Sequence, residues 1–163
     1  MTSKADFNAE EWERVQQGPV VSALMVIAAD RGGTLRESMA AGKAYTDAAA
    51  NSKGTILGEL ASTPPKIDRA AMGTRDELVV RGPQIISESV SVFAAHASPD
   101  EVEEFKRFCL DVAEHTAERT KTGGFLGIGG KRISQAESTV LDEIAGTLRI
   151  ERSMSGPAPA DAG

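Results

Sequence analysis

Apolar residues recur along this chain at intervals of three, four and seven, the spacing that places side chains on one face of an α-helix. The stretch from Val20 to Ala29 is apolar on nearly all sides and is interrupted only by Ser22. A helix that is apolar all round normally lies at the centre of a core. Two further series repeat at seven: Leu78, Ile85 and Val92, and Val79, Ile86 and Phe93. The pattern predicts a helical core built around residues 20–29.

Two more runs complete the predicted core. One buried face is expected on a helix from Ser98-Pro99 to about Lys121 and another on a helix after Ser134. The residues of the first face are Val102, Phe105, Cys109, Val112, Ala113 and Thr116. The residues of the second face are Ala136, Val140, Leu141, Ile144, Ala145 and Leu148.

Helix starts are marked by Ser or Thr followed three residues later by Glu. The pairs are Thr34 and Glu37, Thr74 and Glu77, Ser98 and Glu101, and Ser134 and Glu137. In this arrangement, the capping box, the hydroxyl and the carboxylate each bind a backbone N–H that the helix start leaves unpaired. Asn8 with Glu11 makes a fifth, weaker pair. The chain is therefore expected to be a set of separately capped helices.

Glycine and proline predict where those helices end. Gly18-Pro19 is expected to break the first helix, and Pro83 to kink or break the helix after Thr74, because proline lacks a backbone N–H. Pro64-Pro65 ends a short helix predicted near residues 55–61, and residues 62–73 form a linker.

These elements predict one all-α domain, a bundle of six or seven helices over residues 8–150. Residues 1–7 and 151–163 are expected to be flexible tails, the second because it is rich in Pro, Ala, Gly and Ser. The order helix, glycine turn, capped helix occurs around Thr34 and again around Ser134. Two loosely related helical hairpins are therefore a second expectation.

Composition narrows the classes of function. The 163 residues carry a net charge of −6 and only 4% aromatic residues. Nucleic-acid binding needs clustered Lys and Arg, so no nucleic-acid partner is expected. The longest apolar stretch is far shorter than the ~20 residues of a membrane-spanning helix, so no transmembrane segment is expected. A single cysteine and a polar start indicate a cytoplasmic protein.

Asp30 and Glu37 form the first candidate site. Asp30 stands where the apolar helix ends, and Glu37 lies in the first turn of the next helix. Carboxylates that meet at a turn could hold a hard divalent cation such as calcium or magnesium through oxygen ligands. The alternative is structural, because Glu37 is also the reciprocal cap and Asp before Gly-Gly is common turn chemistry.

The second candidate is the glycine-rich segment from Gly123 to Arg132. It resembles a phosphate loop but lacks that loop's spacing, since Phe125 stands where the first glycine should be. Three structures are open: the apolar residues fold into the core, they form an exposed hook for a partner, or the segment binds an anion. The residues concerned are Gly124, Phe125, Leu126, Ile128, Lys131 and Arg132.

No catalytic set is evident. Asp111, Glu114, His115 and Glu118 lie close on one helix, but the doubled Glu-x-x-His pattern of a carboxylate-bridged metal centre is absent. They are expected to form a solvated acidic face. Cys109 lies on an apolar face and is expected to be a small buried hydrophobe rather than a nucleophile. An enzyme is therefore not expected.

Residues 20–40 resemble the TerB-like family, the helical domain named for tellurite-resistance proteins. The matching residues are Ala28-Ala29-Asp30, Gly33, Thr34 and Glu37. The resemblance implies an all-helical, soluble, intracellular bacterial protein, linked to stress or metal resistance, with Asp30 and Glu37 as cation ligands. Arg31-Gly32-Gly33 spaces the Asp from the Thr one residue differently from the family pattern.

The functional expectation is a non-enzymatic helical binding module of TerB-like type with a protein partner. A divalent cation such as calcium or magnesium is the expected cofactor, at Asp30 and Glu37. The alternative is a protein-interaction or scaffolding domain that uses the loop 123–132.

Overall fold

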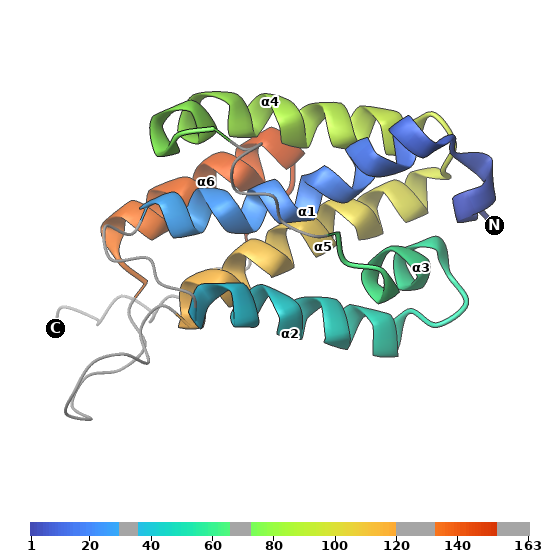
Figure 1. Cartoon of the computed structure of the whole chain (residues 1–163), viewed down its shortest axis with the longest axis horizontal. Helices are drawn as coiled ribbons and strands as arrows, with labels where there is room; N and C mark the ends of the chain where they lie inside the picture. The colour runs from blue at the N-terminus through green and yellow to red at the C-terminus, as the bar shows by residue number, and fades with distance from the viewer. Residues whose placement is uncertain (30–35, 66–72, 120–132, 153–163) are drawn as a thin grey trace, which may run out of the picture.

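A computed structural model describes residues 1–29, 36–65, 73–119 and 133–152, with the backbone alone at 36–41 and 119. The described chain contains six α-helices, no strand and one short 3-10 helix (Figure 1). The 3-10 helix η1 is Lys4–Asp6, and the α-helices are α1 Ala9–Ala29, α2 Arg36–Asn51, α3 Ile56–Ser62, α4 Arg75–Ala94, α5 Pro99–Arg119 and α6 Gln135–Leu148. The prediction of an all-α helical bundle is confirmed.

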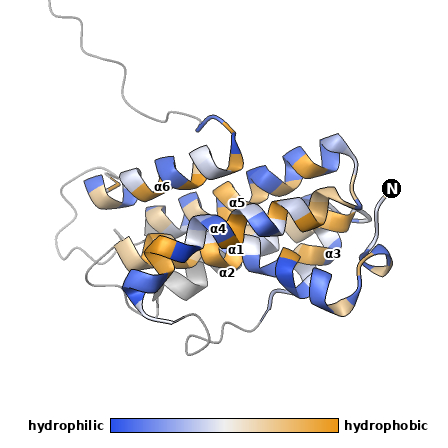
Figure 2. Cartoon of the chain, turned by 90° about the horizontal axis from the view of Figure 1, so that it is seen from above, coloured by the Kyte–Doolittle hydropathy of each residue, from blue (hydrophilic) through white to orange (hydrophobic). Residues whose placement is uncertain are grey.

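Helix α1 runs through the middle of the bundle. It packs most extensively against α4 and α5 and also contacts α6. Every residue from Gly18 to Val26 is buried, including Ser22. The most apolar part of the molecule lies at its centre, where α1 passes between its neighbours (Figure 2). The prediction that residues 20–29 form the centre of the core is confirmed for all but its last turn, where Ile27 and Ala28 are only partly buried.

Helix α5 is the second central element. It contacts α1, α2, α3, α4 and α6, so its buried surface is wider than the single face that the sequence predicts. Phe105 stacks on Phe93 of α4 with ring centroids 4.5 Å apart. The buried residues that the predicted face omits are Phe108, Leu110 and Ala117.

Helix α2 lies at the edge of the bundle. It packs against α5 and α3, and its contact with α1 is slight. The segment α1–α2 is therefore not a packed hairpin, although its two helices follow each other in sequence. The expectation of two related helical hairpins receives no support from this packing.

The predicted break at Gly18-Pro19 is wrong, because α1 continues through it. Pro19 has no N–H to give to the carbonyl four residues earlier, which belongs to Val15. That carbonyl accepts instead from Ser89 Oγ of α4, at 3.0 Å. Gly18 permits the approach, since a Cβ there would lie 2.5 Å from the same Oγ. One serine of α4 thus supplies the hydrogen bond that the proline removes.

Helix α4 likewise continues through Pro83, so no break occurs there. Its neighbour Gly82 is buried against Met25 of α1, where a Cβ would lie 2.5 Å from the sulfur. The two series that repeat at seven along this helix are buried only in part. Leu78, Ile86 and Phe93 are buried, whereas Val79 is 40% exposed.

Residues 1–7 do not form the tail that the sequence predicts. The backbone N–H and the hydroxyl of Thr2 both donate to the Glu101 carboxylate, at 3.0 and 2.9 Å. The Phe7 ring is buried against Phe93 and His96. Hydrogen bonds from the backbone N–H of Ser98 and of Thr2 hold the pKa of Glu101 at about 2. The start of the described chain is therefore fastened to the turn between α4 and α5.

Four of the predicted capping pairs are present. Thr74 with Glu77, Ser134 with Glu137, Ser98 with Glu101, and Asn8 with Glu11 each exchange two hydrogen bonds. The pair of Thr34 and Glu37 lies outside the described residues. In the described ranges no helix is long and apolar enough to cross a membrane.

We expect Ser89→Ala to lower the free energy of unfolding by about 1–3 kcal/mol, because it leaves the buried Val15 carbonyl without a donor. In a Pro19→Ala background the same substitution should cost less, since residue 19 then has an N–H for that carbonyl. Chemical denaturation of the two single variants and the double variant measures the coupling.

Ser91→Ala is the matched control. Ser91 lies on the same helix, but it is exposed and donates to the carbonyl of Ser87 within its own helix. A change within about 0.5 kcal/mol is expected there. Equal costs for Ser89→Ala in the two backgrounds would show that Ser89 does not replace the hydrogen bond lost at Pro19.

Candidate functional site

The candidate residues singled out in the sequence lie outside the described side chains. Asp30 follows the last residue of α1, and Glu37 is the second residue of α2, described by its backbone only. The loop residues Gly124, Phe125, Leu126, Ile128, Lys131 and Arg132 all fall between the end of α5 and the start of α6, outside the description. The cation site and the loop site both stay predictions.

The topology brings the ends of five helices to one end of the bundle. Helices α1 and α5 finish there, and helices α2, α4 and α6 begin there (Figure 1). The connection that carries Asp30 and the loop that carries Phe125 are therefore both attached at this end. We call it the loop end.

A buried carboxylate also belongs to the loop end. Ala136, which the sequence predicts to face inward, is exposed, and Glu137 is buried at 2% exposure instead. Glu137 Oε2 accepts from the backbone N–H of Ser134 at 2.8 Å. Its Oε1 is buried and has no hydrogen-bond partner within the described part of the chain. A carboxylate oxygen left in this state costs free energy unless a donor or a cation meets it.

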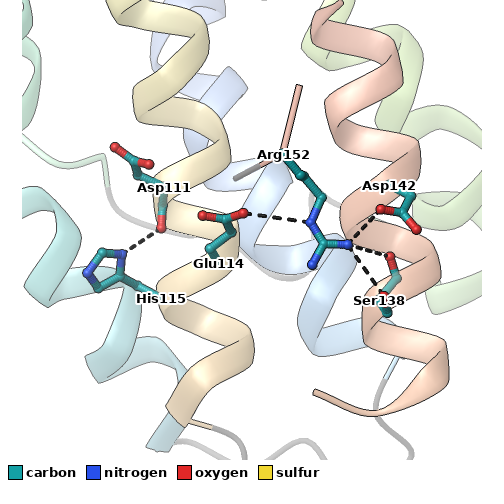
Figure 3. A network of polar contacts seen from close by, with 6 residues as sticks. All are labelled: Asp111, Glu114, His115, Ser138, Asp142 and Arg152. Atoms are coloured by element: carbon teal, nitrogen blue, oxygen red, sulfur yellow. Dashed lines mark hydrogen bonds and ion pairs between the residues drawn. The ribbon is translucent and has the colours of Figure 1, made fainter. Parts of the chain in front are cut away.

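The polar residues of α5 face two different neighbours (Figure 3). Asp111 and His115 point toward α2, and Glu114 points toward α6. The Glu114 Oε1 atom lies 3.7 Å from Arg152 Nε. His115 Nδ1 lies 2.8 Å from the backbone oxygen of Asp111. Asp111 and Glu118 are exposed, as the sequence predicts for a solvated face, whereas Glu114 and His115 are half-buried and point toward different neighbours.

Arg152 links α5 to α6. Its Nη1 donates to Asp142 Oδ1 at 2.6 Å and to the backbone oxygen and hydroxyl of Ser138 at 3.3 and 3.4 Å (Figure 3). Arg152, which the sequence places in a flexible tail at 151–163, is therefore held between two helices. The hydrogen bond from Arg152 to Asp142 is charge-assisted and therefore stronger than one between neutral groups.

Burial acts on both acidic groups of this part of α5. Burial raises the pKa of Glu114, and the positive charge of Arg152 acts in the opposite direction. Burial also raises the pKa of Asp111, which His115 and Arg107 oppose. Glu114 has an ion-pair partner in Arg152, whereas no ion pair or hydrogen bond to the Asp111 carboxylate occurs among the described residues.

Asp111 and His115 line a groove between α2, α3 and α5. Its volume is about 580 Å³. Small-molecule sites commonly have volumes of ~300–1,000 Å³. The side chains and backbone that line it come from Ala44, Asp47, Ala48, Asn51, Ser52, Thr55, Leu57, Glu104, Arg107, Phe108, Asp111 and His115.

Two buried nucleophilic groups of the described chain, the Cys109 thiol and the Tyr45 hydroxyl, are poorly suited to covalent chemistry. Cys109 is fully buried and burial raises the pKa of its thiol, as expected for a structural cysteine. Burial likewise raises the pKa of Tyr45, whose hydroxyl has no hydrogen-bond partner in the described ranges. No three His, Cys, Asp or Glu side chains of the described part are grouped so that they could hold a metal ion.

Sequence reasoning missed the groove because its residues come from three helices. Asp47 and Asp111 are about sixty positions apart and acquire a common surface only when α2 packs on α5. A usable signal was the alanine-rich face of α2, since short side chains leave space beside a neighbouring helix. The sequence identifies Glu137 only as a cap. Its burial depends on which face of α6 packs against the bundle.

Comparison with known proteins adds no relative. No protein-family model, no curated protein and no solved structure matches this chain.

We expect Arg152→Gln to raise the pKa of Glu114 further, because it removes the positive charge that now opposes the effect of burial. Carbon-detected NMR titration of the Glu114 carboxyl measures the change. Arg75→Gln, an exposed arginine on α4, should leave that pKa unaltered. If both variants titrate alike, Arg152 and Glu114 are not paired in solution.

Proposed function

We propose that this protein is a non-enzymatic, TerB-like helical binding module of the cytoplasm that binds a divalent cation at the loop end through Asp30 and Glu37. The observation that supports the proposal most directly is the position of the two residues along the helices. Asp30 directly follows α1, and Glu37 belongs to the first turn of α2, so only six residues separate the two helices. Asp30 is therefore the first residue of one short connection, and Glu37 lies just after its end.

Oxygen ligands suit the hard cations calcium and magnesium. Two carboxylates supply only part of the six to eight ligands that calcium takes, so carbonyl oxygens and water would complete its shell. Glu137, whose buried Oε1 has no hydrogen-bond partner among the described residues, places a further carboxyl group at the same end of the bundle. The link to stress or metal resistance comes from the TerB-like resemblance alone.

We expect a divalent cation to raise the melting temperature of EDTA-treated protein. A ligand at 100 times its dissociation constant stabilises the folded state by about 2.7 kcal/mol. For a chain of this length that corresponds to roughly 5–10 °C. The melts are run with calcium, magnesium, manganese and zinc, and the shift should be selective among them and be lost in Asp30→Ala and in Glu37→Gln.

Asp100→Ala and Glu10→Gln are the matched controls. Both residues lie in the first turn of a helix, as Glu37 does, but α1 and α5 begin at the opposite end of the bundle. These variants should keep the full shift. A flat screen, or a shift that survives both site variants, would exclude the cation site and leave Asp30 and Glu37 as turn and cap residues.

A second candidate function is favoured by apolar surface at the loop end. Val79 and Val80 are 40% and 78% exposed on the first turns of α4. At the same end, Leu24, Ile27 and Ala28 of α1 and Leu78 of α4 are among the residues that line a hollow of about 220 Å³. Exposed apolar patches on soluble proteins often mark sites of protein interaction. We propose as the alternative a scaffolding domain whose loop 123–132 takes part in that contact.

If the loop is an exposed hook, Phe125→Ser and Ile128→Ser should change the free energy of unfolding by no more than about 0.5 kcal/mol. Val80→Ser, at an exposed apolar side chain, is the control for such a change. Losses of ~2–5 kcal/mol would show that Phe125 and Ile128 belong to the core. Slow hydrogen exchange of residues 123–132 in the isolated protein would contradict the hook as well.

A further inference from the structure

The groove between α2, α3 and α5 is open because α2 contributes short side chains to it. Ala44 and Ala48 reach only a methyl group into the space, whereas α5 contributes Phe108. The floor is apolar and closely packed. Leu57 and Phe108 are buried there, and the Phe108 ring meets Tyr45 edge-on at a centroid distance of 5.1 Å. A ligand lying on this floor would cover the small part of Leu57 and Phe108 that is left exposed, 9% and 3%, without disturbing the core.

The rim of the groove carries an excess of negative charge. Asp47 on α2 and Glu104 and Asp111 on α5 supply three carboxylates, against one guanidinium, that of Arg107. Asp47 already pairs with Lys43 of its own helix. His115 lies on the same rim with its Nδ1 against the backbone of its own helix. A negative rim around an apolar floor complements a ligand that combines a cation with a hydrocarbon body.

Asp111 is an exposed rim carboxylate that, like Glu104, has no ion pair or hydrogen bond among the described residues. Neighbouring atoms partly desolvate its carboxylate and raise its pKa. Its side chain points from α5 toward α2 (Figure 3). In the described chain no ion pair or hydrogen bond reaches that carboxylate. An opposite charge in the groove would therefore improve an interaction that the protein alone leaves incomplete.

We propose that the groove between α2, α3 and α5 binds a small organic amine, with its ammonium group among Asp47, Glu104 and Asp111 and its apolar body on Leu57 and Phe108. The volume of about 580 Å³ accommodates a molecule of this size. This site is separate from the loop end and does not depend on a cation at Asp30 and Glu37.

Three probes with the same phenyl body and different charge test the proposal. Phenethylamine is a cation, phenethyl alcohol is neutral and 3-phenylpropionate is an anion at neutral pH. Each is titrated into the full chain while amide chemical shifts are followed by ¹H–¹⁵N NMR. We expect phenethylamine to shift amides of α2 and α5 around Asp47 and Asp111 in a saturable way, and the other two probes to bind at least tenfold more weakly.

Two variants locate the binding. Asp111→Asn keeps the shape of the side chain and removes its charge, and it should weaken phenethylamine binding about tenfold. Ala48→Leu fills the groove from α2 and should abolish binding while the melting temperature is retained. Asp100→Asn, on the same helix but outside the groove, is the control and should bind as the unaltered chain does.

Equal affinity for the three probes would overturn the proposal, because the groove would then be only an apolar hollow. Binding that is unchanged in Asp111→Asn would overturn it too, since the carboxylate would not take part. Absence of saturable shifts with any probe up to several millimolar would do the same. If Ala48→Leu proves unfolded, the comparison of Asp111→Asn with Asp100→Asn still decides the question.

Discussion

The close crossing of α1 and α4 is the contact on which the rest of the fold depends. The two helices meet at two small residues, Gly18 against Ser89 and Gly82 against Met25. Dispersion attraction between atoms weakens steeply with distance. Helices that approach this closely therefore gain dispersion energy along their whole shared length. The approach also lets Ser89 reach the carbonyl that Pro19 leaves free. The glycine, the proline and the serine therefore form one structural unit contributed by two helices.

Helix α5 is the second element on which the fold depends, because it contacts each of the other five α-helices of the described chain. Its apolar side chains fill the core, while its polar ones fall on two opposite sides (Figure 3). On one side Glu114 is matched by Arg152. On the other side Asp111 faces α2 without an ion pair within the described chain, and only the more distant charges of His115 and Arg107 act on it. The side with Glu114 and Arg152 contributes to stability, whereas the side with Asp111 leaves a carboxylate available to a ligand.

The sequence predicted the helices well because local rules determine them. Capping pairs located four of the described helix starts, and hydrophobic spacing found most of the core. It failed where a distant residue changes the outcome. Pro19 ends a helix in isolation, but Ser89 lies seventy positions away and compensates for it. Arg152 and Phe7 belong to expected tails and are held by partners that no local pattern contains. The groove could not be predicted for the same reason, because it exists only between packed helices.

The edge position of α2 has a consequence for how the molecule opens. Helix α2 depends on α5 and α3 for nearly all of its contacts and hardly touches α1. Helix α3 is short, so α2 and α3 together form the part of the fold with the least support from the centre. Native proteins unfold locally in cooperative units, beginning with those that bury the least apolar surface. The pair α2–α3 is thus the unit that can detach first, while α1, α4, α5 and α6 remain folded. Such a partly open form would expose the side of α5 that carries Phe108 and Asp111.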